Sequence, residues 1–190
     1  MARKRSEFRP DTVQEDTLGK LLMTRRQWQR TLKWLLFSAV CLGCLLLQDV
    51  ILSRLGIPAD LVACCILAVC VLQGAHSGCI FVLFASLIYH YSGSAPGVYV
   101  IPLLTFIAVF STIFRQNFLS QGVFTLLLCA VMGMVVYELG VYAVEAFLGN
   151  VSADRIGSFL LTALISAAFL PVLYPIFAAI GKIGGEVWKE

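Results

Sequence analysis

Residues 61–114 read LVACCILAVCVLQGAHSGCIFVLFASLIYHYSGSAPGVYVIPLLTFIAVFSTIF, and these 54 residues contain no Lys, Arg, Asp or Glu. A helix crosses the hydrocarbon core of a bilayer, which is about 30 Å thick, with about 20 mainly apolar residues. The stretch is too long for one helix, so it must fold back inside the membrane or at its edge. Glycine-rich segments at 74–78 and 92–97 predict the two turns.

The composition of the whole chain also indicates an integral membrane protein. Of its 190 residues, 59% are hydrophobic and 13% are charged, whereas a soluble domain is under half apolar and about a quarter charged. This excludes a soluble globular domain, a disordered tail and a nucleic-acid-binding protein. All seven cysteines lie in apolar runs, so we expect them to fill gaps between helices. The spacing of Cys41 and Cys44 also suggests a metal site, but the other ligands that such a site needs are missing from the pattern.

The hydrophobic segments predict an all-α fold, a polytopic membrane bundle of about six transmembrane helices. We expect the helices at about residues 34–53, 61–74, 79–91, 98–114, 120–148 and 156–180. The second and third are short for full spans, so five crossings is the alternative if 61–91 does not cross twice. Pro171 and Pro175 should bend or loosen the last helix.

The distribution of charge predicts the orientation of this bundle. Residues 1–33 contain nine Lys/Arg and four Asp/Glu, whereas residues 34–190 contain five and seven. With six spans and a cytoplasmic N-terminus, the inner side holds twelve cations and the outer side only Arg54 and Arg155. The positive-inside rule therefore predicts a membrane protein with both termini in the cytoplasm.

Three regions follow from this division of charge. Residues 1–33 form a basic cytoplasmic segment, 34–181 a transmembrane helical domain and 182–190 a short cytoplasmic tail. Residues 18–34 could lie along the inner leaflet as an amphipathic helix or form a disordered basic tail.

Acidic residues near the outer helix ends are the first candidates for a functional site. An ionisable group at membrane depth is costly unless it has a partner. Asp60 follows Pro58 at the outer start of the second helix, where a carboxylate either caps the helix or contacts a partner. On the fifth helix, Glu138 and Glu145 are seven residues apart and share a face, with Tyr142 between them. This face either contacts a partner outside the membrane or is a solvated helix end.

Five short motifs carry a resemblance to a known family. They are LQ at 47–48, LGIPADL at 55–61, GAHSG at 74–78, LIYHYSG at 87–93 and GVY at 97–99. Their order, over about residues 34–181, resembles the rod shape-determining protein MreD family. The chain departs from the family pattern at two positions: it has His90 in place of an aspartate that ends the third helix, and Ala59 separates Pro58 from Asp60.

The resemblance implies a non-enzymatic membrane component of the bacterial cell-elongation machinery, which builds peptidoglycan and sets cell shape. Its fold would be similar to the substrate-binding subunits of energy-coupling-factor vitamin transporters. Its partner would be MreC, and through MreC the glycosyltransferase RodA, a penicillin-binding transpeptidase and the MreB filament.

Two functions from different classes follow. A scaffold would bind the transmembrane helix and juxtamembrane segment of a partner, with close helix approach at small residues. These candidate packing residues are Gly43, Ala130, Gly133 and Gly140. A substrate-binding transporter subunit is the alternative, and it would have an outward pocket with aromatic walls and acidic polarity. The residues expected for that pocket are Tyr99, Tyr142, Asp60 and Glu138.

A membrane hydrolase is the third and weakest hypothesis. His76, Ser77 and His90 suggest it, but a nucleophile needs its base within hydrogen-bond reach, and no oxyanion-hole motif accompanies them. The sequence contains no phosphate loop, nucleotide fingerprint or metal motif. We therefore expect no enzymatic activity and no cofactor.

Overall fold

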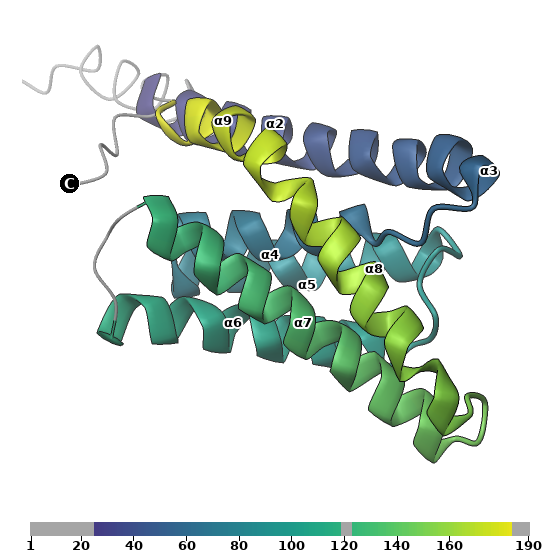
Figure 1. The fold of residues 1–190 in the computed structure, drawn as a ribbon. Helices are drawn as coiled ribbons and strands as arrows, with labels where there is room; N and C mark the ends of the chain where they lie inside the picture. Colours follow the sequence, from purple (N-terminus) through teal and green to yellow (C-terminus); the bar gives the residue numbers. More distant parts are fainter. Residues whose placement is uncertain (1–24, 119–122, 184–190) are drawn as a thin grey trace, which may run out of the picture.

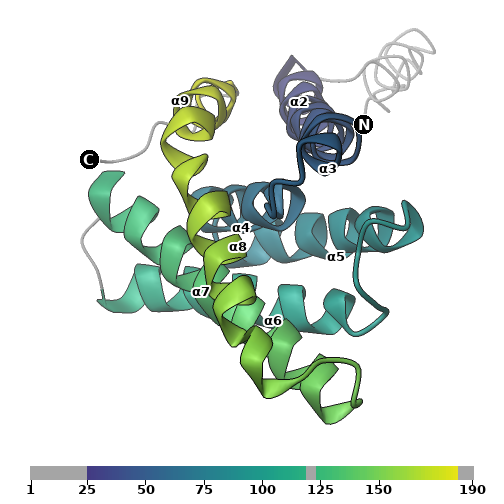
Figure 2. The same cartoon turned by 45° about the vertical axis from the view of Figure 1, so that its right-hand side comes forward.

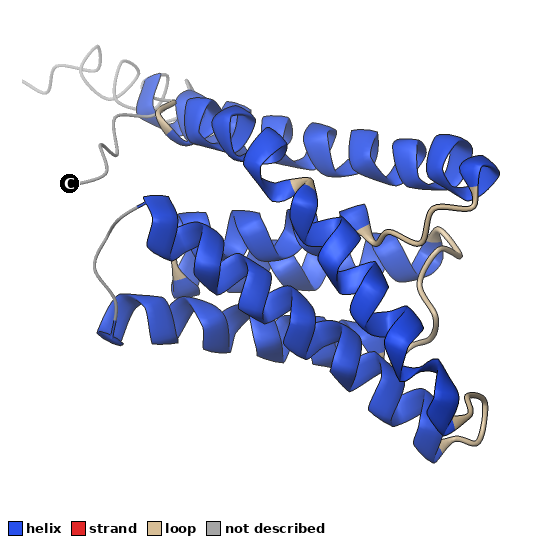
Figure 3. Ribbon diagram, in the orientation of Figure 1, coloured by secondary structure: helices blue, strands red, loops and turns tan. Residues whose placement is uncertain are grey.

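Helices joined by short loops make up the computed structural model, which describes residues 25–118 and 123–183 (Figure 3). No strand occurs within those two ranges, so the all-α prediction is confirmed there. The elements are α2 (Arg25–Leu47), the π-helical turn η1 (Gln48–Leu52), α3 (Ser53–Leu55), α4 (Leu61–Gln73), α5 (Ala75–Tyr91), α6 (Val100–Phe118), α7 (Val123–Phe147), the 3-10 turn η2 (Ala153–Arg155), α8 (Ile156–Ala168) and α9 (Leu170–Gly181). The predicted basic segment up to residue 24 and the tail after residue 183 lie outside the described residues.

Three helices are long and apolar enough to cross a membrane by themselves. They are Gln27–Leu55, Val100–Asn117 and Val123–Phe147. The bent pair α8 and α9 makes a fourth if it forms one span, and α4 and α5 are shorter apolar helices. Length and composition therefore give three or four spanning helices in the described residues, fewer than the six predicted.

Helix α4 lies at the centre of the bundle. Every residue from Leu61 to Leu72 is buried, and the helix packs against α2, α5, α6, α7, α8 and α9. Figures 1 and 2 show α2 and α9 on one side of α4 and α5, with α6 and α7 on the other. A helix that is hydrophobic all round is one that neighbours cover on all sides. This explains why the sequence of α4 has no polar face.

The turn between α4 and α5 is one residue long, not the five residues predicted at 74–78. Gly74 reverses the chain with a φ of +88°, a conformation that glycine adopts without the steric cost of a Cβ. Gly78 lies inside α5, and a Cβ there would be 2.9 Å from the Cys70 sulfur and 3.0 Å from the Cys70 carbonyl oxygen. Gly78 is therefore a helix-packing glycine, which brings the backbones of α4 and α5 close together.

Helix α2, which contains the first predicted span, already includes residues 25–33, so the prediction that this helix starts at residue 34 is wrong. Residues 25–33 contain Arg, Gln, Leu and Lys, which have high helix propensity, so the helix extends from the apolar segment into the polar one. The described part of the predicted segment 18–34 is thus continuous with the first spanning helix.

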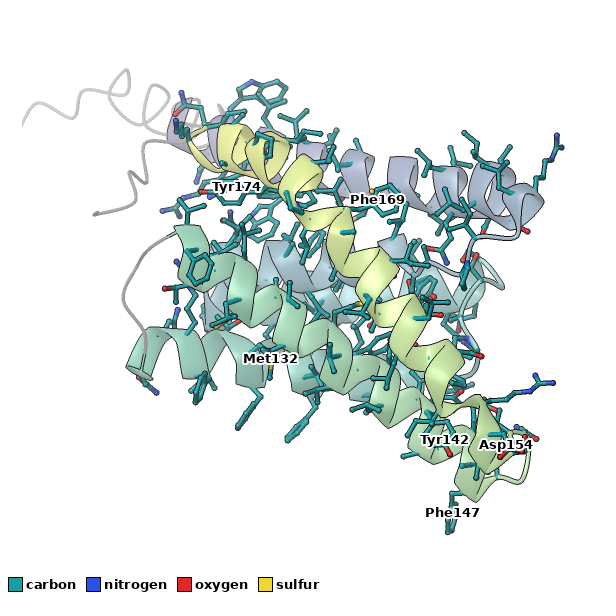
Figure 4. All side chains as sticks on the ribbon, in the orientation of Figure 1. Met132, Tyr142, Phe147, Asp154, Phe169 and Tyr174 are labelled. Carbon is teal, nitrogen blue, oxygen red and sulfur yellow. The ribbon has the colours of Figure 1, made fainter. Side chains whose placement is uncertain are left out.

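The last predicted helix is divided in two, and the expected bend is confirmed. Helices α8 and α9 meet at Phe169 with a bend of 46° (Figure 4). Pro171 has no N–H to donate to the carbonyl of Ala167, and its ring crowds that carbonyl.

Charged residues separate toward the two ends of the bundle. Helix α2 begins and α9 ends at the same end of the molecule, which we call the basic end (Figure 1). The cations near it include Arg30 and Lys33 in the first turns of α2, Arg115 in the last turn of α6 and Lys182 directly after α9. The opposite end, which we call the acidic end, is formed by η1, α3, the start of α4, the later part of α7 and η2. These elements hold all the acidic residues of the described ranges, Asp49, Asp60, Glu138, Glu145 and Asp154, together with Arg54 and Arg155.

Candidate functional site

A pocket of about 470 Å³ opens at the acidic end, and we call it the acidic pocket. It lies between η1, the segment before α4, the ends of α5 and α7, and α8. Its carboxylates are Asp60, Glu138 and Glu145, and its other polar groups include Gln48, Tyr89 and Tyr137. Among the described residues that line it, none is Lys, Arg or His. Three of the four predicted partner-contact residues therefore meet in one concave site.

Asp60 is held in place by three hydrogen bonds. Its Oδ1 accepts from the Ala63 N–H at 2.9 Å, which caps α4, and its Oδ2 accepts from the Tyr89 hydroxyl at 2.9 Å. Its own N–H donates to Ser166 Oγ at 2.7 Å. Asp60 is 8% exposed. The capping role considered from the sequence is thus present, and the same carboxylate lines the pocket.

The π-helical turn η1 brings Gln48 to the start of α4. The Gln48 Oε1 accepts from the Val62 N–H at 3.2 Å, so a side chain from the first helix satisfies a backbone donor of the central one. Single π-turns are rare in proteins overall, but those that occur often lie at functional sites. This turn is what places Gln48 in the pocket wall.

Glu138 and Tyr137 are buried polar side chains without hydrogen-bond partners. Glu138 is 4% exposed and has no hydrogen bond or ion pair within the part of the chain that the structure describes. It lies within electrostatic range of Asp60. Tyr137 is 1% exposed, and its hydroxyl comes near the Asp60 carboxyl but makes no hydrogen bond among the described residues. A buried polar group without a partner costs free energy, so these two side chains need an explanation.

Glu145 and Asp49 hold in place the segment 92–99, of which Ser94 and Pro96 line the pocket. The Tyr99 hydroxyl donates to Glu145 Oε1, and Asn150 Nδ2 donates to Glu145 Oε2 at 2.8 Å. The Ser94 hydroxyl donates to Asp49 Oδ2 at 2.7 Å. Burial and the bond to Glu145 raise the pKa of Tyr99 above its usual range, so its phenol stays a donor.

Tyr142 lies apart from the carboxylates that flank it in the sequence. Its ring packs against Phe159, with centroids 5.5 Å apart, and its hydroxyl donates to the Ala153 carbonyl at 3.4 Å. Figure 4 shows Tyr142 beside Asp154, near η2. Glu138 and Glu145 share a face as expected, whereas Tyr142 covers the start of α8.

The small residues on α7 face other helices of the chain. Ala130 is buried, a Cβ at Gly133 would lie 3.0 Å from Ser111 Oγ, and a Cβ at Gly140 would lie 3.0 Å from Leu103. By contrast, a Cβ at Gly43 on α2 would meet nothing within 4 Å. The structure thus places three of the four predicted packing residues at helix contacts within this chain.

A second concavity, of about 510 Å³, runs between α6 and α7, and we call it the apolar groove. Phe106, Phe110 and Phe114 form a ladder along it, with successive ring centroids 6.3 and 6.5 Å apart. Met132 lines the opposite wall on α7 (Figure 4), and Gly133 forms part of the groove surface. Phe110 is 62% exposed, so the ladder faces outward from the bundle.

The residues of the hydrolase hypothesis are far apart. The Ser77 hydroxyl donates to the Gln73 carbonyl at 3.1 Å, at the start of α5. His90 lies in the last turn of the same helix, about 20 Å away at 1.5 Å per residue. The two side chains do not form a nucleophile and base pair.

The cysteines occupy helix contacts. All except Cys79 are buried, and the Cys41 and Cys65 sulfurs are 2.8 Å apart between α2 and α4. The described residues contain no group of three His, Cys, Asp or Glu that could hold a metal ion.

Comparisons with family models, with curated proteins and with solved structures found no match to this chain. The proposal for its function therefore rests on the sequence motifs, the acidic pocket and the apolar groove.

Four residues of the pocket region were not assigned from the sequence: Gln48, Tyr89, Tyr137 and Ser166. Tyr137 directly precedes Glu138, a predicted site residue, so its place beside the site could be inferred from the sequence. Ser166 is 106 residues from Asp60 in the sequence, and no local pattern connects the two.

Proposed function

We propose that this chain is a non-enzymatic integral membrane scaffold of the bacterial cell-elongation machinery, similar to MreD, and that it binds MreC. Through MreC it would join RodA, a penicillin-binding transpeptidase and MreB, and so take part in peptidoglycan synthesis and cell shape. Its fold would be similar to the substrate-binding subunits of energy-coupling-factor transporters.

A topology of six crossings with both termini in the cytoplasm is part of this proposal. Two features support counting α4 and α5 as crossings. Neighbouring helices surround α4, so its polar ends are satisfied inside the protein and it does not need the full length of a lipid-exposed span. Helix α2 also begins at the same basic end where α9 finishes (Figure 1), and cations favour the cytoplasmic side.

The apolar groove is the observation that carries the scaffold proposal. In lipid, helices associate through close packing, and small residues allow backbones to approach. The groove offers a wall of stacked phenylalanine rings and a glycine at its floor, and its volume of about 510 Å³ accommodates several side chains of one helix. The proposed occupant is the single transmembrane helix of MreC.

Co-purification of MreC with groove variants tests the proposal. We expect the double substitution Phe106→Ala and Phe110→Ala to lower MreC recovery at least about tenfold, equivalent to about 1.4 kcal/mol of binding free energy. Both rings are more than half exposed, so their loss should leave the bundle folded. Phe124→Ala is the matched control, because Phe124 is 78% exposed on α7 and lies outside the groove lining.

The scaffold proposal fails if the double variant recovers as much MreC as the wild-type chain. It also fails if depletion of the protein leaves both cell width and MreC recovery unchanged.

A second candidate is the substrate-binding subunit of a vitamin-type transporter. The acidic pocket favours it, because its volume lies within the range of small-molecule sites, about 300–1,000 Å³. A transporter subunit would co-purify with a membrane module that carries ATPases, and the scaffold would not. This measurement separates the two candidates.

A further inference from the structure

We infer that the acidic pocket binds an organic ammonium ion, which enters from the acidic end of the bundle. This inference rests on the pocket alone and does not depend on MreC binding.

The charge of the pocket is the first observation. Asp60, Glu138 and Glu145 line it, and no Lys, Arg or His is found among the described lining residues. The hydrogen-bond donors to the carboxylates of Asp60 and Glu145 in the described residues are backbone N–H, hydroxyl and amide groups, all of them neutral. These hydrogen bonds satisfy oxygens but supply no opposite charge. A buried carboxylate is stable when a positive group is beside it, so the pocket favours a cation.

The unpartnered groups are the second, independent observation. Glu138 is 96% buried, has no hydrogen bond within the described ranges and faces the pocket. The Tyr137 hydroxyl is buried without a partner among those same residues, and its side chain lines the same pocket. An ammonium group has three N–H donors. One can go to the Glu138 carboxylate and a second to the Tyr137 oxygen, which gives both groups a hydrogen-bond partner.

The walls favour an organic cation over a bare metal ion. The rings of Tyr89, Tyr137 and Phe159 line the pocket, and aromatic faces attract ammonium ions through their quadrupoles. The volume of about 470 Å³ is far larger than a metal ion needs. In the described part of the chain, no three His, Cys, Asp or Glu side chains lie close enough together to hold a metal ion.

Arg54 and Arg155 do not supply the positive charge for the pocket. Both lie at the acidic end, but both are exposed and neither lines the pocket. The ammonium group must therefore come from outside the described residues, either as a free amine or as the lysine side chain of a partner.

The binding experiment uses the purified full-length chain in dodecyl maltoside, a neutral detergent. Putrescine, spermidine and N-acetyl-lysine amide are titrated by calorimetry and by thermal unfolding, with 1,4-butanediol as the uncharged match for putrescine. We expect at least one amine to bind with a Kd below about 1 mM and to raise the Tm, and the diol to do neither. Binding of putrescine or spermidine indicates a free amine, and binding of the lysine amide alone indicates a partner's side chain.

Isosteric variants decide which residues bind the ammonium ion. We expect Glu138→Gln to weaken amine binding at least about tenfold and Tyr137→Phe to weaken it by a smaller factor. Asp154→Asn is the control, because Asp154 is an exposed carboxylate at the same end but outside the lining, and its affinity should stay within about twofold.

Two results would overturn the inference: amines that bind no better than the diol, or a Glu138→Gln variant that binds them like the wild type. If Glu138→Gln fails to fold, Tyr137→Phe takes its place: a Tyr137→Phe variant that binds amines like the wild type would overturn the inference. Because MreC recovery is measured separately, loss of amine binding is distinguishable from loss of the scaffold function.

Discussion

The backbone N–H of Asp60 donates a hydrogen bond to Ser166 Oγ at 2.7 Å, and so joins the start of the central helix to α8 just before its bend. Ser166 is 0% exposed. The Cys64 thiol also donates to the Ser166 carbonyl at 3.4 Å. One serine thus fixes the position of both the acidic pocket and the bent C-terminal pair.

Ser166→Ala should destabilise the protein by about 1–3 kcal/mol, because it leaves the buried N–H of Asp60 without an acceptor. Thermal unfolding in detergent measures the loss. Ser158→Ala on the same helix is the control, since Ser158 is exposed and its hydroxyl makes no hydrogen bond within the described residues. Equal unfolding temperatures for the two variants would show that the Asp60–Ser166 bond is not needed.

Two glycine-to-alanine substitutions should change the stability of the folded protein in opposite directions. Gly78→Ala places a methyl group within 3.1 Å of three Cys70 atoms, two of them backbone atoms, so α4 and α5 must move apart. A cost of about 1–3 kcal/mol is typical of such overpacking. Gly43→Ala enters open space inside α2, where alanine is favoured over glycine by about 0.5–1 kcal/mol. Thermal unfolding measures both changes. If Gly78→Ala has the same Tm as the wild type, the close packing of α4 and α5 at Gly78 is contradicted.

Tyr99→Phe should loosen the segment over the acidic pocket, because Glu145 loses its phenol donor. Hydrogen bonds to charged groups contribute about 1.5–3 kcal/mol. The pKa of Tyr99 is raised in the folded state, so its contribution is full below about pH 10, the ordinary value for tyrosine, and falls as pH rises above it.

Tm measurements from pH 7 to 11 check this dependence. The difference between wild type and Tyr99→Phe should stay constant to about pH 9 and shrink above pH 10. Tyr91→Phe, at a tyrosine that is 83% exposed, should show no such difference at any pH. A gap between wild type and Tyr99→Phe that widens at high pH would contradict the assignment.

The six-span topology is tested by thiol labelling from one side of the membrane. In a chain with its native cysteines replaced, a membrane-impermeant maleimide should label Arg155→Cys in intact cells and leave Lys182→Cys unlabelled. Both positions are exposed, so access through the membrane decides the outcome. Labelling of both from outside would mean that they lie on the same side and would remove the basis for the topology.

The sequence contains enough information to predict the class of fold. The charge-free run 61–114 predicts several apolar helices joined by turns, and Pro171 predicts the bend, because both features depend on residues close together in the sequence. The predicted start of the first spanning helix, at residue 34, is wrong. The polar residues before it continue the helix, because an amphipathic segment does not break the backbone hydrogen bonding. Gly78 was assigned to a turn because a glycine in a loop and a glycine at a helix crossing look the same in one sequence.

The acidic pocket was predictable only in part. Asp60, Glu138 and Glu145 were identified because charge in an apolar chain is conspicuous. Tyr142 and Tyr99 were expected in the pocket walls, but Tyr142 covers α8 and Tyr99 holds the rim. Helix periodicity gives the face of a residue but not which neighbour covers it, and Ser166 reaches Asp60 through tertiary packing alone.

Polar side chains form hydrogen bonds with the backbone at both ends of helix α4. At the acidic end Asp60 and Gln48 cap it, and at the basic end Arg115 Nη1 donates to the Val71 carbonyl at 2.6 Å. Its 13 residues are about 20 Å long, about two thirds of the thickness of the hydrocarbon slab. In the proposed six-span topology, the polar groups at one or both ends of α4 would therefore lie below the lipid headgroups, where the neighbouring helices keep them away from the acyl chains.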